Sequence, residues 1–280
     1  MTAPELWWVL SAVSVAFLIV DWSHAPIDTT MHVGFLLIAA AMGPLGAVTY
    51  VLTVREPLPG THLQYIAPRW KQVIGSTFHC VAGDSVGIIG AGVAVRFVPA
   101  ISASMILSLT VEYLTGFLVG WLIFQSLFMK DMAGGSYRQA VKHMFLPEWL
   151  SMNGVMAGMI AVMVPWMRID PSAGTPSQPT FWFMMSMALI AGAIVAYPLN
   201  WWLVGANLKH GIMSTATTQD HSMSVSGPTD SETSQKKASH MSRHLAKSAP
   251  GSTKTRARTV VPIAFWSVGL LGTALALTLW

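Results

Sequence analysis

The chain has 280 residues, of which 53% are hydrophobic and only 10% are charged, and its mean hydropathy is +0.53. Soluble domains carry roughly a quarter charged residues, so this composition excludes an ordinary water-soluble globular protein. The net charge of +4 does not indicate a nucleic-acid partner, because Lys and Arg in a membrane protein mainly mark its cytoplasmic loops. A single cysteine, Cys80, excludes an intramolecular disulfide.

Apolar stretches of about 20 residues recur along the chain, each long enough to cross a hydrocarbon core of about 30 Å. The first stretch lacks a preceding basic residue, so we interpret it as a retained helix and not as a signal peptide. The predicted fold class is all-α, a polytopic membrane helix bundle of about seven transmembrane helices. These spans are predicted at residues 6–20, 33–54, 73–95, 101–124, 146–164, 182–204 and 260–280.

The Lys and Arg residues are unevenly divided between the two sides of these spans. Fourteen lie on one side and only Arg96 and Arg168 on the other, which predicts a cytoplasmic N-terminus and a C-terminus outside. Residues 212–259 are rich in Ser, Thr, Lys and His, too polar to bury a core, and are predicted to be a disordered cytoplasmic linker. We therefore expect a six-helix core at residues 1–211 and a tethered C-terminal helix at residues 260–280.

Two carboxylates lie inside predicted spans. Asp84 and Glu112 are each eleven residues from a span end, about 16 Å deep at the helical rise, so they are predicted to meet near the membrane midplane. Ionisable groups at such depth mark functional sites by default. Two adjacent acids repel unless one is protonated or a cation lies between them. Small residues on both helices permit close approach, although glycines at this spacing often serve packing alone.

Further polar groups are predicted near this depth. His79, with Asn153 and Tyr197, could form a second station nearer the cytoplasm, which would suit proton relay. Prolines interrupt the spans at residues 43–46 and 197–200, where freed backbone groups either line a polar cavity or form an ordinary proline kink. The predicted cation site comprises Asp84, Glu112, His79, Cys80, Asn153, Tyr197 and Asn200.

The chain is also rich in soft ligands, with 18 methionines. Met152, Met156, Met159, Met163 and Met167 form one stripe at helical spacing, and Met31 and His32 lie at the predicted external mouth. Thioether, imidazole and thiolate suit copper(I) and in part zinc, but a methionine stripe can equally be core packing. The predicted metal ligands are His79, Cys80, Asp84, Glu112, Met156, Met159, Met31 and His32, with copper as the first choice of metal.

Several of these segments together resemble the uncharacterised bacterial membrane family known as domain of unknown function 4396. The resemblance covers residues 32–211 and rests on the segments at residues 43–46, 78–84, 112–113, 116–117, 197–204 and 209–211. It implies an integral protein of the bacterial inner membrane, and it implies no particular activity because the family has none settled.

These features favour a permease-like protein that handles a cation, either a transition metal such as copper or a proton-coupled ion. The alternative is a membrane-embedded assembly protein, without transport activity, that recruits a protein partner or a second copy through its small-residue helix faces. An enzyme is less favoured: His79 and Cys80 are adjacent and point about 100° apart on a helix, which makes a poor nucleophile–base pair. Walker, Rossmann and HExxH motifs are also absent from the sequence.

Overall fold

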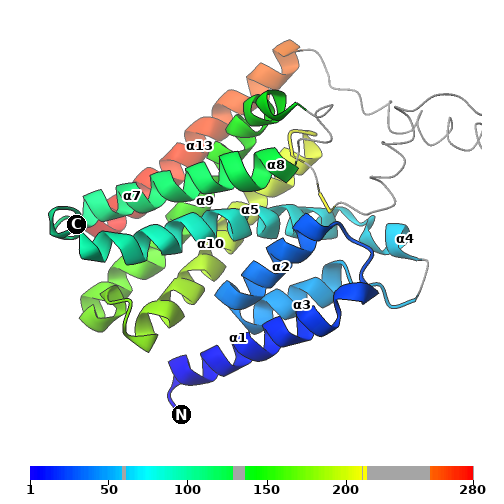
Figure 1. The fold of residues 1–280 in the computed structure, drawn as a ribbon. Coiled ribbons are helices and arrows are strands. Elements are labelled where there is room, and N and C mark those ends of the chain that lie inside the picture. Colours follow the sequence, from blue (N-terminus) through cyan, green and yellow to red (C-terminus); the bar gives the residue numbers. More distant parts are fainter. Residues whose placement is uncertain (59–60, 129–135, 210, 213–252, 280) are drawn as a thin grey trace, which may run out of the picture.

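The structure is a computed structural model that describes residues 1–58, 61–128, 136–209, 211–212 and 253–279 (Figure 1). These ranges contain helices and no strand, and six of the helices are long and apolar enough to cross a membrane. The predicted all-α membrane bundle is therefore confirmed. The six are α1 (Ala3–Val20), α5 (Arg69–Ala94) with η2 (Val95–Phe97), α7 (Met105–Leu118) with η3 (Val119–Gln125), α9 (Tyr137–Ile169), α10 (Pro179–Gly205) and α13 (Thr253–Leu279).

The predicted second span is a helical hairpin and does not cross as one helix. Its two arms, α2 (Thr29–Met42) and α3 (Pro44–Thr53), lie side by side and run in opposite directions (Figure 1). Gly43 joins them at a φ of 58°, a left-handed conformation that favours glycine, and Pro44 then starts α3. The longer arm extends only about 21 Å, less than the hydrocarbon core. The chain therefore enters and leaves at the same end of the bundle.

This reversal changes the relation between the two termini. Asp21, which follows α1, pairs with Arg55, which follows α3, at an N–O distance of 2.8 Å, so both helices end together. The later long helices then alternate in direction, and the N-terminus and the end of α13 lie at the same end of the bundle (Figure 1). The described residues contain six long apolar helices in place of the seven predicted spans, and the prediction that the two termini lie on opposite sides of the membrane stays a prediction.

Helices α5 and α9 form the centre of the molecule. They are buried along most of their length, whereas α1 and α13 are mostly exposed at the periphery. Helix α10 packs against α9 and runs without interruption through Pro198, so the predicted break at that proline is not found. Short elements connect the long helices: η1 (Trp22–His24), α4 (His62–Ile66), α6 (Pro99–Ser102), α8 (Ser126–Phe128) and η4 (Pro171–Gly174).

The C-terminal helix α13 packs along α9. It begins at Thr253, seven residues before the predicted span. Most of the predicted linker, residues 213–252, lies outside the described residues, and so do the histidines and methionines that the sequence places in it. The side chain of Ser267 in α13 is buried and accepts a hydrogen bond from Asn153 Nδ2 in α9 at 3.2 Å.

Candidate metal centre

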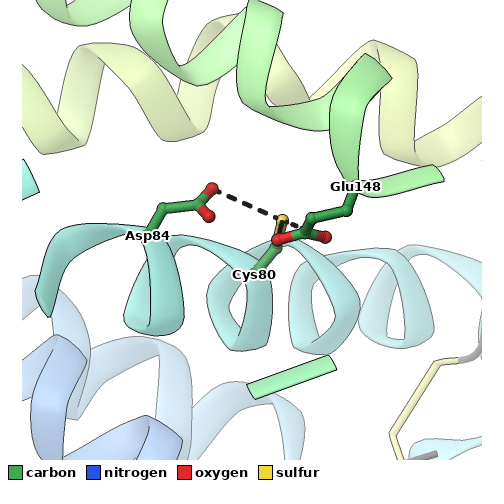
Figure 2. Close-up of side chains that lie close together, drawn as sticks. All are labelled: Cys80, Asp84 and Glu148. Carbon is green, nitrogen blue, oxygen red and sulfur yellow. Dashed lines mark hydrogen bonds between the residues drawn. The ribbon is translucent and has the colours of Figure 1, made fainter. Parts of the chain in front are cut away.

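Three metal-ligating side chains gather in the middle of the bundle, two from α5 and one from α9 (Figure 2). Cys80 and Asp84 are four residues apart and so lie on the same face of α5. The Cys80 thiol lies 3.1 Å from both oxygens of Glu148 and 3.7 Å from Asp84 Oδ2. All three residues are fully buried, and one ligand atom from each lies within 4.8 Å of the other two.

Polar side chains beyond these three extend the cluster toward α10. The Ser151 hydroxyl lies 3.3 Å from Cys80 Sγ and accepts a hydrogen bond from Asn200 Nδ2 at 3.0 Å. Lys209 donates to Asn200 Oδ1 at 3.1 Å and to Glu148 Oε2 at 3.4 Å. Asn200, a predicted site residue, therefore belongs to this cluster together with a buried lysine ammonium.

The chain after α10 folds back to bring Lys209 to the acids. Asn207 adopts a left-handed conformation with a φ of 53°, and the Leu208 amide donates to the Leu203 carbonyl at 2.9 Å, as in a Schellman cap. This turn directs Lys209 into the bundle, where only 4% of the residue is exposed. Burial alone would lower the pKa of Lys209, but Cys80, Glu148 and Asp84 outweigh it and raise that pKa above its ordinary value.

Asp84 carries a ligand atom of the cluster that makes no hydrogen bond within the described residues. Its Oδ1 is buried and has no hydrogen-bond partner among the described side chains, although buried carboxylate oxygens are ordinarily paired. This atom faces Gly120, where an added Cβ would collide with it and would also approach Glu148 Oε1 to 2.8 Å. Gly120 belongs to η3, a seven-residue π-helix, and π-helical turns recur at functional sites.

Glu112 does not join Asp84, contrary to the prediction. Where α5 crosses α7, Gly87 lies against Gly116, and one turn further along Asp84 lies against Gly120 of η3. In this register the residue of α5 beside Glu112 is Gly92. Eight residues, about 12 Å of helix, separate Gly92 from Asp84. The equal-depth argument failed because α7 begins at Met105, after the separate turn of α6, and is thereby shifted along α5.

His79 lies next to Cys80 in sequence but on another face of α5. A Cβ added to Gly34 of α2 would lie 3.3 Å from His79 Nδ1, and Met31 and Phe35 border the same small hollow. His32 follows Met31 in α2, and its Nε2 lies 3.2 Å from the Ala25 carbonyl oxygen. These residues lie at the Lys/Arg-rich end of the bundle, where α2 begins, and not at the opposite mouth as predicted. They are not among the three residues whose ligand atoms gather within 4.8 Å of one another at Cys80.

Asn153 and Tyr197 also lie apart from the cluster. Asn153 accepts a hydrogen bond from Tyr113 at 2.8 Å and donates to Ser267, so it joins α7, α9 and α13. Tyr197 is half-buried on α10 and its ring lies 6.0 Å from that of Trp201. The predicted second station of His79, Asn153 and Tyr197 is therefore not assembled.

The methionine stripe belongs to the apolar core. Met156 and Met159 are buried among aliphatic side chains of α9 and α10, including Val155 and Ala188. Within the described part of the chain, the Cys80 thiol donates to oxygens of Asp84, Glu148 and Ser151 and to no thioether. This arrangement supports the packing interpretation of the stripe and removes the main argument for copper(I).

Three members of the cluster were missed by sequence reasoning: Glu148, Ser151 and Lys209. The predicted fifth span began at residue 146, which placed Glu148 at the membrane interface, whereas α9 begins nine residues earlier. The signal that could have revealed Glu148 is the proline before it. Pro147 lies inside α9 and not before its start, so Glu148 belongs to the membrane-embedded part of the helix. Lys209 follows the predicted sixth span and was interpreted as part of the cytoplasmic loop. The residues next to it carry no sequence pattern that predicts the turn back into the bundle.

The donor set fits a divalent transition metal with a small adjustment. Zinc binds thiolate sulfur at about 2.3 Å and carboxylate oxygen at about 2.0–2.2 Å, so ligands of one ion lie about 3.5 Å apart. A separation of up to 4.8 Å therefore requires rotamer shifts of about 1 Å. The partnerless Asp84 Oδ1 and the fully buried carboxylate of Glu148 supply the negative charge that such an ion needs.

The fold and this cluster define a multi-pass membrane helix bundle with a buried thiol–carboxylate centre. The family described as domain of unknown function (DUF4396) matches residues 69–209, which begin at α5 and end at Lys209, and the chain belongs to this family. All six residues of the cluster lie inside the matched range. Comparisons with curated proteins and with solved structures gave no match.

Proposed function

We propose that this protein binds a divalent transition-metal ion at Cys80, Asp84 and Glu148 and carries it across the membrane. The observation that supports this most is the convergence of a thiol and two carboxylates, fully buried and within 4.8 Å of one another. Isolated charges are too costly to keep inside a membrane bundle without a compensating ion or a function. Helix packing does not require charge, so two acids buried together inside a membrane bundle favour a cation-binding role over a packing role.

The donor atoms favour a borderline ion such as Zn²⁺. Thiolate selects zinc and copper(I), whereas carboxylates suit harder divalent ions, and only a borderline ion is served by both. With Met156 and Met159 in the apolar core, the set lacks the thioethers that would favour copper(I). Zinc is therefore the cation of first choice here, and copper is the second.

Lys209 gives the proposed carrier a built-in counter-charge. Its ammonium donates to Glu148 at 3.4 Å, so a metal ion that binds Glu148 must compete with it. In our proposal Lys209 pairs with the acids when no metal is bound and withdraws when the metal arrives. This exchange keeps the buried charge nearly constant, which lowers the cost of an empty site during a transport cycle.

The proposal is tested by zinc flux into liposomes that contain the purified full-length protein and a zinc indicator. Wild-type protein should raise the rate well above that of empty liposomes, and Glu148→Gln should lose most of the increase. The control is Glu5→Gln, which removes an exposed acid at the N-terminus and should transport normally. Flux equal to that of empty liposomes would contradict transport, and undiminished flux in Glu148→Gln would contradict the site.

A further inference from the structure

A second cavity lies at the opposite end of the bundle from Lys209, between η2, α6, α7 and α9. Its volume is about 240 Å³, room for about eight water molecules at the liquid density. Arg96 and Glu112 both line it, and the other walls mix apolar and hydroxyl groups from Ser108, Leu109 and Met163. This cavity shares no residue with the metal centre.

The two charged groups of the cavity are not paired with each other. Arg96 Nε and Glu112 Oε2 are both buried, and neither has a hydrogen-bond partner within the described residues. The described ion pairs include no Arg96–Glu112 pair. Buried polar atoms are nearly always satisfied, and a guanidinium is always charged. Two opposite charges that share a cavity without forming an ion pair leave space for a ligand that contacts both.

The charge balance selects the class of ligand. A metal ion or a simple amine would pair with Glu112 and leave Arg96 facing added positive charge. A simple carboxylate would pair with Arg96 and leave Glu112 unsatisfied. A ligand that carries an ammonium and a carboxylate satisfies both and keeps the cavity neutral, which is the cheapest arrangement at low dielectric.

We propose that this cavity binds a small zwitterion, with its ammonium at Glu112 and its carboxylate at Arg96. The volume suits a free amino acid with a short side chain, which Leu109 and Met163 can contact. An ethanolamine lipid headgroup has the same pair of charges. Glu112, however, lies seven residues into α7, about 10 Å from its first residue, and this depth favours a free solute over a headgroup attached to its acyl chains.

The test is calorimetric binding to purified full-length protein in lipid-free detergent. The probes are glycine, L-alanine and β-alanine, with ethylamine and propionate as analogues that each keep one of the two charges. At least one zwitterion should bind at least tenfold more tightly than both analogues. Glu112→Gln and Arg96→Gln should each weaken it at least tenfold, and Arg168→Gln, an exposed arginine at the same end, should not.

Binding of ethylamine as tight as that of the best zwitterion would overturn the proposal, and so would the absence of binding by every zwitterion. The analogue comparison uses wild-type protein, so it remains decisive if a variant fails to fold. A second measurement compares nanodiscs of phosphatidylethanolamine with nanodiscs of phosphatidylcholine. Amino-acid binding that is equal in both supports a free solute, and binding that is lost only in phosphatidylethanolamine shows that the headgroup is the occupant.

Discussion

At the scale of single residues, the buried lysine determines how the proposed metal centre behaves when no metal is bound. Lys209 is the ion-pair partner of Glu148, and both side chains are almost completely enclosed. Breaking a buried ion pair by removing one partner typically costs about 3–5 kcal/mol, because the remaining charge is left in a low dielectric. The two acids are therefore stable together when a cation, either Lys209 or a metal ion, accompanies them or when one of them is protonated.

Replacing this ammonium should shift the balance toward the metal. In Lys209→Met we expect metal-free protein to melt at a lower temperature, because Glu148 and Asp84 lose their counter-charge. Zinc should then bind at least tenfold more tightly, a change of about 1.4 kcal/mol, because it no longer competes with Lys209. Thermal melts and zinc titration check both effects, with Lys142→Met, an exposed lysine of α9, as the control. Equal zinc affinity in wild type and Lys209→Met would contradict the exchange.

The sequence located half of the metal centre. Cys80, Asp84 and Asn200 could be predicted because a polar residue inside an apolar span is conspicuous, whatever its partners are. Glu112 was conspicuous for the same reason, and only the offset between α5 and α7 shows that it belongs to a different cavity. Lys209 could not be predicted, since its position depends on a left-handed turn at Asn207 that leaves no hydrophobic pattern.

At the scale of the elements, the π-helix η3 brings the backbone of Gly120 against Asp84. A π-helical turn widens the helix and displaces the residues that follow, and η3 itself packs against α5. The close approach requires glycine because Asp84 and Glu148 occupy the place of its Cβ. The local geometry of η3 thus limits how far the two acids can move.

A methyl group at this position should therefore disturb the site. Gly120→Ala should cost about 1–3 kcal/mol through overpacking and should also weaken zinc binding, because the Asp84 side chain is displaced. Gly90→Ala is the matched control: it is also a helix glycine, but its added Cβ would meet nothing within 4 Å. Urea or thermal unfolding together with zinc titration separates the two. Equal behaviour of both variants would show that the contact at Gly120 has no influence on the site.

The hairpin of α2 and α3 shows where hydrophobicity alone fails to predict topology. Its 25 residues are as apolar as a single span, and the reversal depends on one residue, Gly43, whose positive φ permits the turn. The proline pattern at residues 43–46 did signal an interruption. A kink and a reversal share that signal, and only the packing of Phe35 against Tyr50, with ring centroids 5.6 Å apart, distinguishes them.

At the scale of the whole molecule, charge and helix direction together set the orientation that we propose. Arg55, Arg69, Lys71 and Lys209 lie at one end of the bundle, and Arg96 and Arg168 lie at the other. The positive-inside rule assigns the first end to the cytoplasm. Because the N-terminus and the end of α13 lie at the second end (Figure 1), both should be outside. In this orientation Lys209 lies at the cytoplasmic end of the bundle, and the proposed zwitterion cavity lies at the outer end.

Labelling with a membrane-impermeant maleimide tests this topology. In a Cys80→Ser background, right-side-out vesicles should react at Thr2→Cys and at a cysteine added after Trp280. Arg138→Cys, an exposed position at the start of α9, should react only after the vesicles are opened. Protection of Thr2→Cys while the C-terminal cysteine reacts would restore the seven-span topology and would contradict the hairpin.

The metal content of the purified full-length protein tests the central claim most directly. After incubation with excess Zn²⁺ and desalting, elemental mass spectrometry should find one ion per chain in wild type and little in Cys80→Ser, Asp84→Asn or Glu148→Gln. Glu112→Gln should retain its ion, because Gly92 and not Asp84 lies beside Glu112. Wild-type protein without bound metal, or loss of the ion in Glu112→Gln alone, would contradict a metal centre at Cys80, Asp84 and Glu148.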